Sequence, residues 1–181
     1  TRREHCVSNS GQSLRKIAFL FPGQGSQEVG MGADLFETSA FFRDLVAIGS
    51  DMNQVDLRKI CLRGPERALS TPSNLQALVC AVSLAYQREL ADRGVEADVI
   101  LGHSLGELTT LGAAGVVSPE DTIRIAAFRG QLMDRVAQQM NGGMMAVLFM
   151  PLDAVEQLLH DLHAPERIVL ANDNAPDQIV L

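Results

Sequence analysis

The feature that most constrains this chain is the pentapeptide Gly-His-Ser-Leu-Gly at residues 102–106. A short apolar stretch at 97–101 precedes it, and residues 107–114 after it have the composition of a helix. A serine in a Gly-x-Ser-x-Gly turn between a strand and a helix is typical of a nucleophile elbow, where strained backbone holds the hydroxyl toward a substrate. The start of the following helix would face an oxyanion formed there. We therefore predict that Ser104 is a nucleophile; the alternative is a glycine-rich turn with a capping serine.

Composition narrows the class of protein. The 181 residues are 46% hydrophobic and carry a net charge of −7, which favours one globular domain and argues against a general nucleic-acid binder. No apolar run approaches the roughly 18 residues of a membrane-spanning helix. Cys6, Cys61 and Cys80 are far apart and form no metal-binding cluster, so we expect reduced thiols in a cytoplasmic protein, with Cys80 buried.

The first strong strand signal is the apolar run at 16–21, which ends at a proline. The loop that follows, 22–27, contains two glycines. In a parallel α/β sheet, ligands bind at the carboxyl ends of the strands, so Gln24 is either a substrate-facing residue or part of an ordinary turn. Residues 1–15 are polar and are predicted to be a flexible lead-in or linker.

Helical spacing of apolar residues predicts helices over 32–48, 74–93 and 119–139. Ser118 as N-cap and Pro119 at the first position mark the start of the last one. Gln76, near the start of the second helix, faces either a cleft or solvent. Arg129, in the third helix, is by itself more typical of a surface ion pair than of a ligand-binding residue. Four cations between residues 58 and 67 form either a solvated face or a docking patch for an acidic partner: Arg58, Lys59, Arg63 and Arg67.

The pattern changes after a hinge-like break at 141–143. Strands are predicted at 144–149, 167–171 and 178–181, a helix at 153–162, and a turn at 172–177. Such a β-α-β-β order is the beginning of a ferredoxin-like unit, which the chain would end before completing. We thus expect a lead-in over 1–15, a first subdomain over 16–141 and the start of a second over 142–181.

Four segments occur in a telling order: FLFPGQGSQ at 19–27, GHSLGE at 102–107, FRG at 128–130 and ANDNAP at 171–176. From residue 16 to 181 the chain resembles the malonyl-CoA:acyl carrier protein transacylase family and the acyltransferase domains of polyketide and fatty-acid synthases. The resemblance implies an α/β fold: an α/β-hydrolase-like large subdomain with an inserted ferredoxin-like small subdomain, both incomplete at the C-terminus of this chain.

The resemblance also implies a reaction. Ser104 would take a malonyl group from coenzyme A and pass it to the phosphopantetheine thiol of an acyl carrier protein, with no bound cofactor or metal. Backbone N–H groups of Gln24 and Leu105 would form the oxyanion hole, and Arg129 would pair with the malonyl carboxylate. Possible cleft-lining residues are Gln76, His103 and Asn172.

One part of the family pattern is missing, because the family's general-base histidine would lie beyond residue 181. The chain offers His5, His103, His160 and His163, none of them well placed. We therefore expect the first part of an acyltransferase, with little or no transfer activity alone. The alternatives are a serine hydrolase or thioesterase, which Arg129 argues against, and a non-catalytic docking module.

Overall fold

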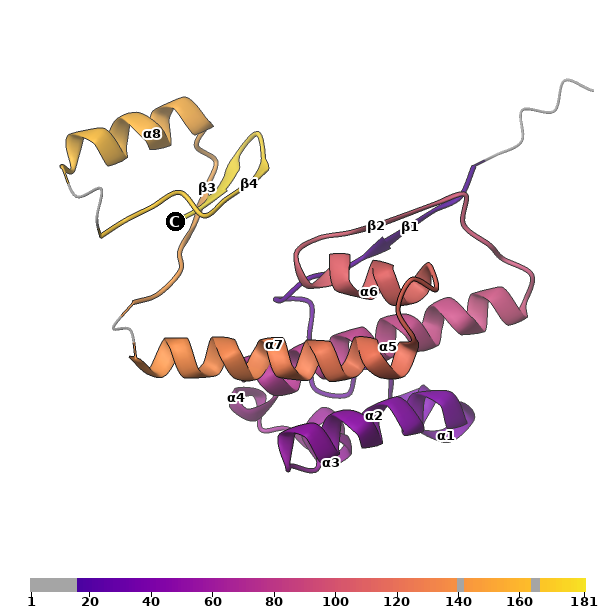
Figure 1. The fold of residues 1–181 in the computed structure, drawn as a ribbon. Coiled ribbons are helices and arrows are strands. Elements are labelled where there is room, and N and C mark those ends of the chain that lie inside the picture. The colour runs from indigo at the N-terminus through magenta and orange to yellow at the C-terminus, as the bar shows by residue number, and fades with distance from the viewer. Residues whose placement is uncertain (1–15, 140–141, 164–166) are drawn as a thin grey trace, which may run out of the picture. The chain divides into compact units, whose positions relative to one another are not determined.

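The structure is a computed structural model that describes residues 16–139, 142–163 and 167–181 (Figure 1). It contains two compact units, which divide between Arg135 and Val136. The predicted lead-in at 1–15 and the first residue of the predicted hinge, Asn141, lie outside the described residues. Of the helices within the described ranges, none combines the length and apolar composition needed to cross a membrane.

The first unit combines a small parallel sheet with several helices. Its elements are β1 (Ala18–Phe21), α1 (Ala33–Thr38), α2 (Ala40–Asn53), α3 (Leu57–Arg63), α4 (Glu66–Leu69), α5 (Pro72–Asp92), β2 (Val99–Gly102), α6 (Leu105–Ala113) and most of α7 (Pro119–Gln139), whose last four residues belong to the second unit. Strands β1 and β2 run parallel, with Phe21 opposite Gly102. Their carboxyl ends therefore lie side by side, which brings the loops after both strands together.

Helix α5 forms the centre of the hydrophobic core. Helix α5 lies between α2 and α6 (Figure 1), and its buried apolar side chains belong to the same core as those of both neighbours. Leu75 and Leu78 are fully buried, and each such leucine contributes about 1.5–3 kcal/mol through burial. The core thus fixes the position of α6, the helix that follows the predicted nucleophile.

The predicted helix ends are partly confirmed. Helix α7 begins as expected, with the Ser118 hydroxyl accepting a hydrogen bond from the Asp121 N–H at 3.0 Å. The single helix predicted over 32–48 is wrong, because two helices, α1 and α2, meet at Ser39. Ser39 is extended, and its hydroxyl caps α2 by accepting from the Phe42 N–H at 3.2 Å. The extended backbone of Ser39 ends α1, and its hydroxyl caps the start of α2.

The second unit contains β3 (Ala146–Leu148), α8 (Leu152–Asp161), β4 (Asn172–Ala175) and β5 (Gln178–Val180). Its strands form an antiparallel sheet in the order β3-β5-β4, with Ile179 buried. The predicted strand at 167–171 is wrong, and most of the predicted turn at 172–177 is strand β4. Pairing with β5 decides this: Asn172 lies opposite Val180, a bulge lies between Asp173 and Ala175, and only 176–177 make the turn.

Candidate active site

Ser104 lies between β2 and α6 in a strained conformation. Its φ is 52° and its ψ is −103°, values that cost a non-glycine residue on the order of 1–3 kcal/mol. The Ser104 carbonyl accepts the Glu107 N–H at 3.0 Å, which ties the turn to the first turn of α6. The residue is exposed, so the strained turn presents the hydroxyl at the surface.

The two flanking glycines are required by close backbone contact. A Cβ on Gly106 would collide with the Phe21 carbonyl of β1, and a Cβ on Gly102 would collide with the backbone of Gly106. Any side chain at either position would push α6 away from the sheet. The Gly-x-Ser-x-Gly spacing therefore reflects the tight approach of strand and helix on both sides of Ser104.

The loop after β1 lies directly against this turn. The His103 N–H donates to the Phe21 carbonyl at 3.1 Å, and a Cβ on Gly23 would lie only 2.7 Å from the His103 carbonyl oxygen. Gln24 follows on the same loop and is exposed. Within the described part of the chain, no hydrogen bond uses the backbone N–H of Gln24 or of Leu105. Both donors thus remain available close to the serine turn.

Arg129 and Gln76 form a pair between α7 and α5. Arg129 Nη1 donates to Gln76 Oε1 at 2.7 Å, and Gln76 Nε2 donates to Met133 Sδ at 2.9 Å. Gln76 is fully buried, so the solvent-facing alternative for this residue is wrong. Arg129 is half-buried and has five N–H donors, which leaves it able to bind a second acceptor such as a carboxylate.

Cys80, one turn after Gln76 on α5, is a free, buried thiol, as predicted, and Cys61 is also free and buried. The Thr109 hydroxyl donates to Cys80 Sγ at 3.2 Å. Burial raises the pKa of the Cys80 thiol to about 11, and the Thr109 hydrogen bond and the Arg129 charge oppose that rise. The thiol is therefore protonated and unreactive near neutral pH. Cys6 lies outside the described residues.

Three of the remaining predicted residues belong to the second unit, and His103 directly precedes Ser104 in the first. Asn172, the first residue of β4, is exposed and belongs to the second unit, as do His160 and His163, whose rings lie 5.9 Å apart. His160 Nδ1 lies 3.4 Å from the Asp161 carboxylate.

His103 is exposed, and its Nδ1 lies 2.9 Å from the position of a Cβ on Gly23, so its ring covers that glycine. His5 lies outside the described residues. The described residues contain no group of side chains that could hold a metal ion.

Comparison with known proteins decides the family. Residues 18–181 match the family described as the acyl transferase domain. This chain belongs to the acyl transferase domain family. Of the acyl transferases it matches, the malonyl CoA-acyl carrier protein transacylase of Bacillus subtilis (strain 168) is 34% identical over 169 residues, covering 93% of this chain and 53% of that protein. The PksC transacylase of polyketide biosynthesis from the same organism is 35% identical, covering 91% and 55%.

Solved structures of acyl transferases agree. The transacylase of Xanthomonas oryzae pv. oryzae is 39% identical, with a TM-score of 0.80 over 91% of this chain and 53% of that one. A malonyl-transacylase solved in complex with a type II polyketide synthase acyl-carrier protein is 31% identical, with a TM-score of 0.79 over 92% of this chain and 54% of that one. The predicted family and the α/β fold are thus confirmed, and this acyl transferase chain spans about half the length of the relatives it matches.

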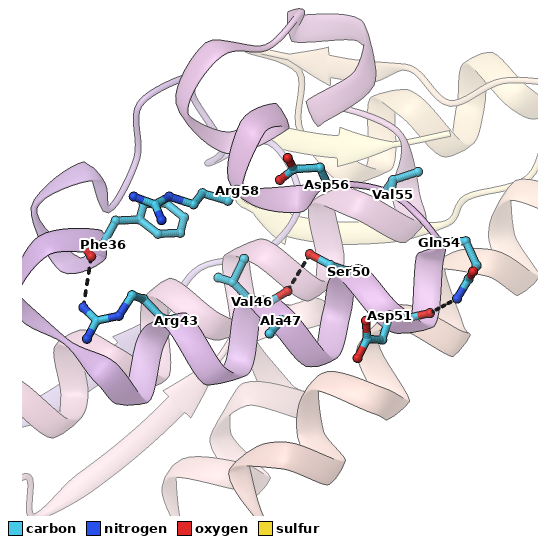
Figure 2. Close-up of a pocket in the computed structure, with 10 residues that line it drawn as sticks. All are labelled: Phe36, Arg43, Val46, Ala47, Ser50, Asp51, Gln54, Val55, Asp56 and Arg58. Atoms are coloured by element: carbon cyan, nitrogen blue, oxygen red, sulfur yellow. Dashed lines mark hydrogen bonds between the residues drawn. The ribbon is translucent and has the colours of Figure 1, made fainter.

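A groove elsewhere in the first unit is a poorer candidate site. It encloses about 620 Å³ between α2 and α3 (Figure 2). Its polar groups serve the fold: Arg43 donates to the Phe36 carbonyl at 3.0 Å, Ser50 donates to the Val46 carbonyl at 2.8 Å, and Arg58 lies over the Phe36 ring. It contains no exposed nucleophile in strained backbone. The docking role of the cations at 58–67 stays a prediction.

Two residues shape the site, although the sequence analysis assigned them no role there. Met133 contacts the Gln76 amide, and Gly130 lies against the start of α5. The apolar spacing of 119–139 predicts that Met133 faces inward, but not that it contacts Gln76. Gly130 did carry a signal, because a glycine inside a helix costs about 1 kcal/mol and therefore points to close packing.

Proposed function

We propose that this protein transfers a malonyl, or another dicarboxylic acyl, group from coenzyme A to the phosphopantetheine thiol of an acyl carrier protein. The observation that carries the proposal is the Arg129–Gln76 pair in the same unit as the strained serine turn. A half-buried guanidinium held on one side by an amide is suited to a free carboxylate on the other side. A simple esterase would have no use for it.

In the proposed reaction, the Ser104 hydroxyl attacks the thioester carbonyl, and coenzyme A leaves as the thiol. The carrier's phosphopantetheine thiol then attacks the resulting acyl-serine and regenerates the Ser104 hydroxyl, so the reaction is ping-pong. The N–H groups of Gln24 and Leu105 would stabilise the oxyanion, with about 3 kcal/mol from each donor. Coenzyme A and phosphopantetheine are substrates here, and no bound cofactor is required.

The relatives support the partner. Two of them are named malonyl CoA-acyl carrier protein transacylases, and one solved malonyl-transacylase is bound to an acyl-carrier protein. We propose the same kind of carrier as the partner of this protein. We also propose that the first unit belongs to an α/β-hydrolase-like subdomain and that the antiparallel sheet of the second belongs to a ferredoxin-like one.

The general base is proposed to come from a segment that these 181 residues do not contain. A base must reach the Ser104 hydroxyl within hydrogen-bond distance. The ring of His103 covers Gly23, and His160 Nδ1 lies 3.4 Å from the Asp161 carboxylate. The matched segment covers 53% and 55% of two relatives, so each relative has further length in which a base can lie.

Intact-protein mass spectrometry after incubation with malonyl-CoA tests the proposal. It is run on the 181-residue chain and on a form extended to the length of the relatives, each beside a Ser104→Ala control. We expect a malonyl adduct on the extended form that the Ser104→Ala substitution removes, and little or none on the shorter form. An adduct that survives Ser104→Ala contradicts the assigned nucleophile, and rapid hydrolysis without transfer to a carrier favours a thioesterase.

A further inference from the structure

We propose that Gln131 and Asp134 of α7 are positioning residues that set Arg129 against Gln76 and thereby determine the preference for acyl groups with a free carboxylate. The inference rests on the proposed function, since it assigns Arg129 the carboxylate. Among the residues that the structure describes, the hydrogen bonds of Gln131 and Asp134 go to α2 and to the start of α5 and not to the Arg129–Gln76 pair. Both act through the place where α7 meets the start of α5.

The contact between the two helices is close at Gly130. A Cβ there would collide with Ser73 Cα and would lie 2.6 Å from the Pro72 carbonyl oxygen. Gly130 is buried, so α7 meets the first turn of α5 backbone to backbone. Such a contact fixes the distance between the helices but resists sliding only weakly, because a glycine has no side chain to interlock.

Asp134 supplies the first constraint on sliding. Its Oδ2 accepts the Ser73 N–H at 3.3 Å, which is one of the N-terminal donors of α5 that lack a partner inside the helix. The N-cap residue Thr71 does not fill this role, because its hydroxyl donates to the Arg67 carbonyl at 3.2 Å. A carboxylate from α7 thus caps α5 and also interacts favourably with the positive end of its dipole.

Gln131 supplies the second constraint. Its Nε2 donates to the Met52 carbonyl at 2.8 Å and to Asn53 Oδ1 at 2.9 Å, both at the end of α2. Asn53 Nδ2 in turn donates to the Ser73 carbonyl at 2.9 Å. Helix α7 is therefore tied to α2 and α5 through one connected set of hydrogen bonds centred on Ser73.

This set lies one helical turn from the Arg129–Gln76 pair. Ser73 and Gln76 are three residues apart on α5, so they share a face. Arg129 and Met133 are four residues apart on α7, and each contacts an end of the Gln76 amide. Ile123, a large buried residue of α7, lies about two turns before Gly130, and the apolar residues closer to the contact, Ala126 and Ala127, are small and give little registration there. The polar set consequently decides where along α5 the guanidinium lies, and a shift of about 1 Å is enough to lose a bidentate contact.

The test compares loading of Ser104 by malonyl-CoA and by acetyl-CoA, as kcat/KM, in the full-length protein. We expect Gln131→Ala and Asp134→Ala each to lower the malonyl-to-acetyl ratio by about 5- to 10-fold, through a higher KM for malonyl-CoA. Asp134→Asn keeps an acceptor for the Ser73 N–H and should restore most of the ratio. Asp121→Ala, on the exposed start of the same helix, is the matched control and should leave the ratio unchanged.

A double-mutant cycle with Arg129→Ala separates positioning from general structural damage. If Gln131 acts through Arg129, then Gln131→Ala has no further effect on the ratio in the Arg129→Ala background. Additive losses, or equal losses for malonyl-CoA and acetyl-CoA, overturn the positioning role. An Arg129→Ala variant that keeps its malonyl preference instead overturns the proposed function itself. Thermal unfolding of each variant identifies any that fails to fold; should Asp134→Ala be one, Gln131→Ala and its cycle decide the question.

Discussion

Helices α5 and α7 have the same length, 21 residues, but they are held in the molecule in different ways. Eleven residues of α5 are buried, against five of α7. The α5 helix packs on α2 and α6 through large apolar side chains. The α7 helix buries one large apolar side chain, Ile123, and otherwise small ones such as Ala126, while Phe128 and Leu132 remain 51% and 42% exposed.

This difference means that the two residues of the Arg129–Gln76 pair are held in place by different kinds of interaction. Gln76 lies on the helix that apolar burial holds rigidly, and Arg129 lies on the helix that a few directional contacts locate. Burial is non-directional and stabilises the fold, whereas hydrogen bonds specify geometry at a smaller gain in stability. Substitutions on α5 should therefore act on stability, and substitutions on α7 should act on the position of Arg129.

The largest expected effect is on α5. Leu78→Ala removes a fully buried side chain and should lower the free energy of unfolding by about 3 kcal/mol, since the cavity adds to the lost burial. Leu132→Ala, on the exposed side of α7, should lower it by less than about 1 kcal/mol. Chemical denaturation measures both, and equal losses would break the proposed contrast between the helices.

A smaller loss is expected at the contact between the helices. Gly130→Ala forces a Cβ against the α5 backbone and should cost about 2 kcal/mol, in spite of the better helix propensity of alanine. Gly49→Ala in α2 is the control, because its Cβ would meet side-chain atoms and no backbone: Leu57 Cδ1 at 2.8 Å and Ala77 Cβ at 3.2 Å. A cost at Gly49 as large as that at Gly130 would show that the backbone contact is unimportant.

The burial of the Cys80 thiol on α5 can be tested through the pH dependence of the free energy of unfolding. In the unfolded chain the thiol loses its proton near the ordinary cysteine pKa of 9.0, whereas the folded thiol keeps it up to a pKa of about 11. The folded state therefore binds the extra proton between these values, so stability is lost as the pH rises. We expect Cys80 to account for about 1 kcal/mol of the loss between pH 8 and pH 10. Urea denaturation of wild type and Cys80→Ala at several pH values measures this loss. If the free energy of unfolding of both proteins fell equally with pH, the Cys80 thiol would not be buried from water as described.

The smallest effect should come from the exposed start of α7. Asp121 and Arg124 form an ion pair at 2.7 Å, with both side chains at least half exposed. Pairs of this kind in solvent contribute little, so Asp121→Ala should leave the urea midpoint unchanged within error. A clear drop would mean that α7 depends on its first turn as well as on its contact with α5.

The sequence by itself determined the features that depend on neighbouring residues. The pentapeptide at 102–106 predicted the strand–serine–helix order, and Ser118 with Pro119 predicted the start of α7, because turns and caps are built from residues adjacent in the chain. The ordered set of segments also indicated the family, which the comparisons confirm.

Only the tertiary structure decided features that depend on distant partners. Residues 172–175 are polar and look like a turn, yet backbone pairing with β5 makes them a strand. Gln76 could have faced solvent, but α7 covers it and aims its amide at Arg129 and Met133. The contacts of Ser73 with Asn53 and Asp134 join residues 20 and 61 positions apart. Such pairings depend on how the helices pack, which the periodicity of a single segment does not encode.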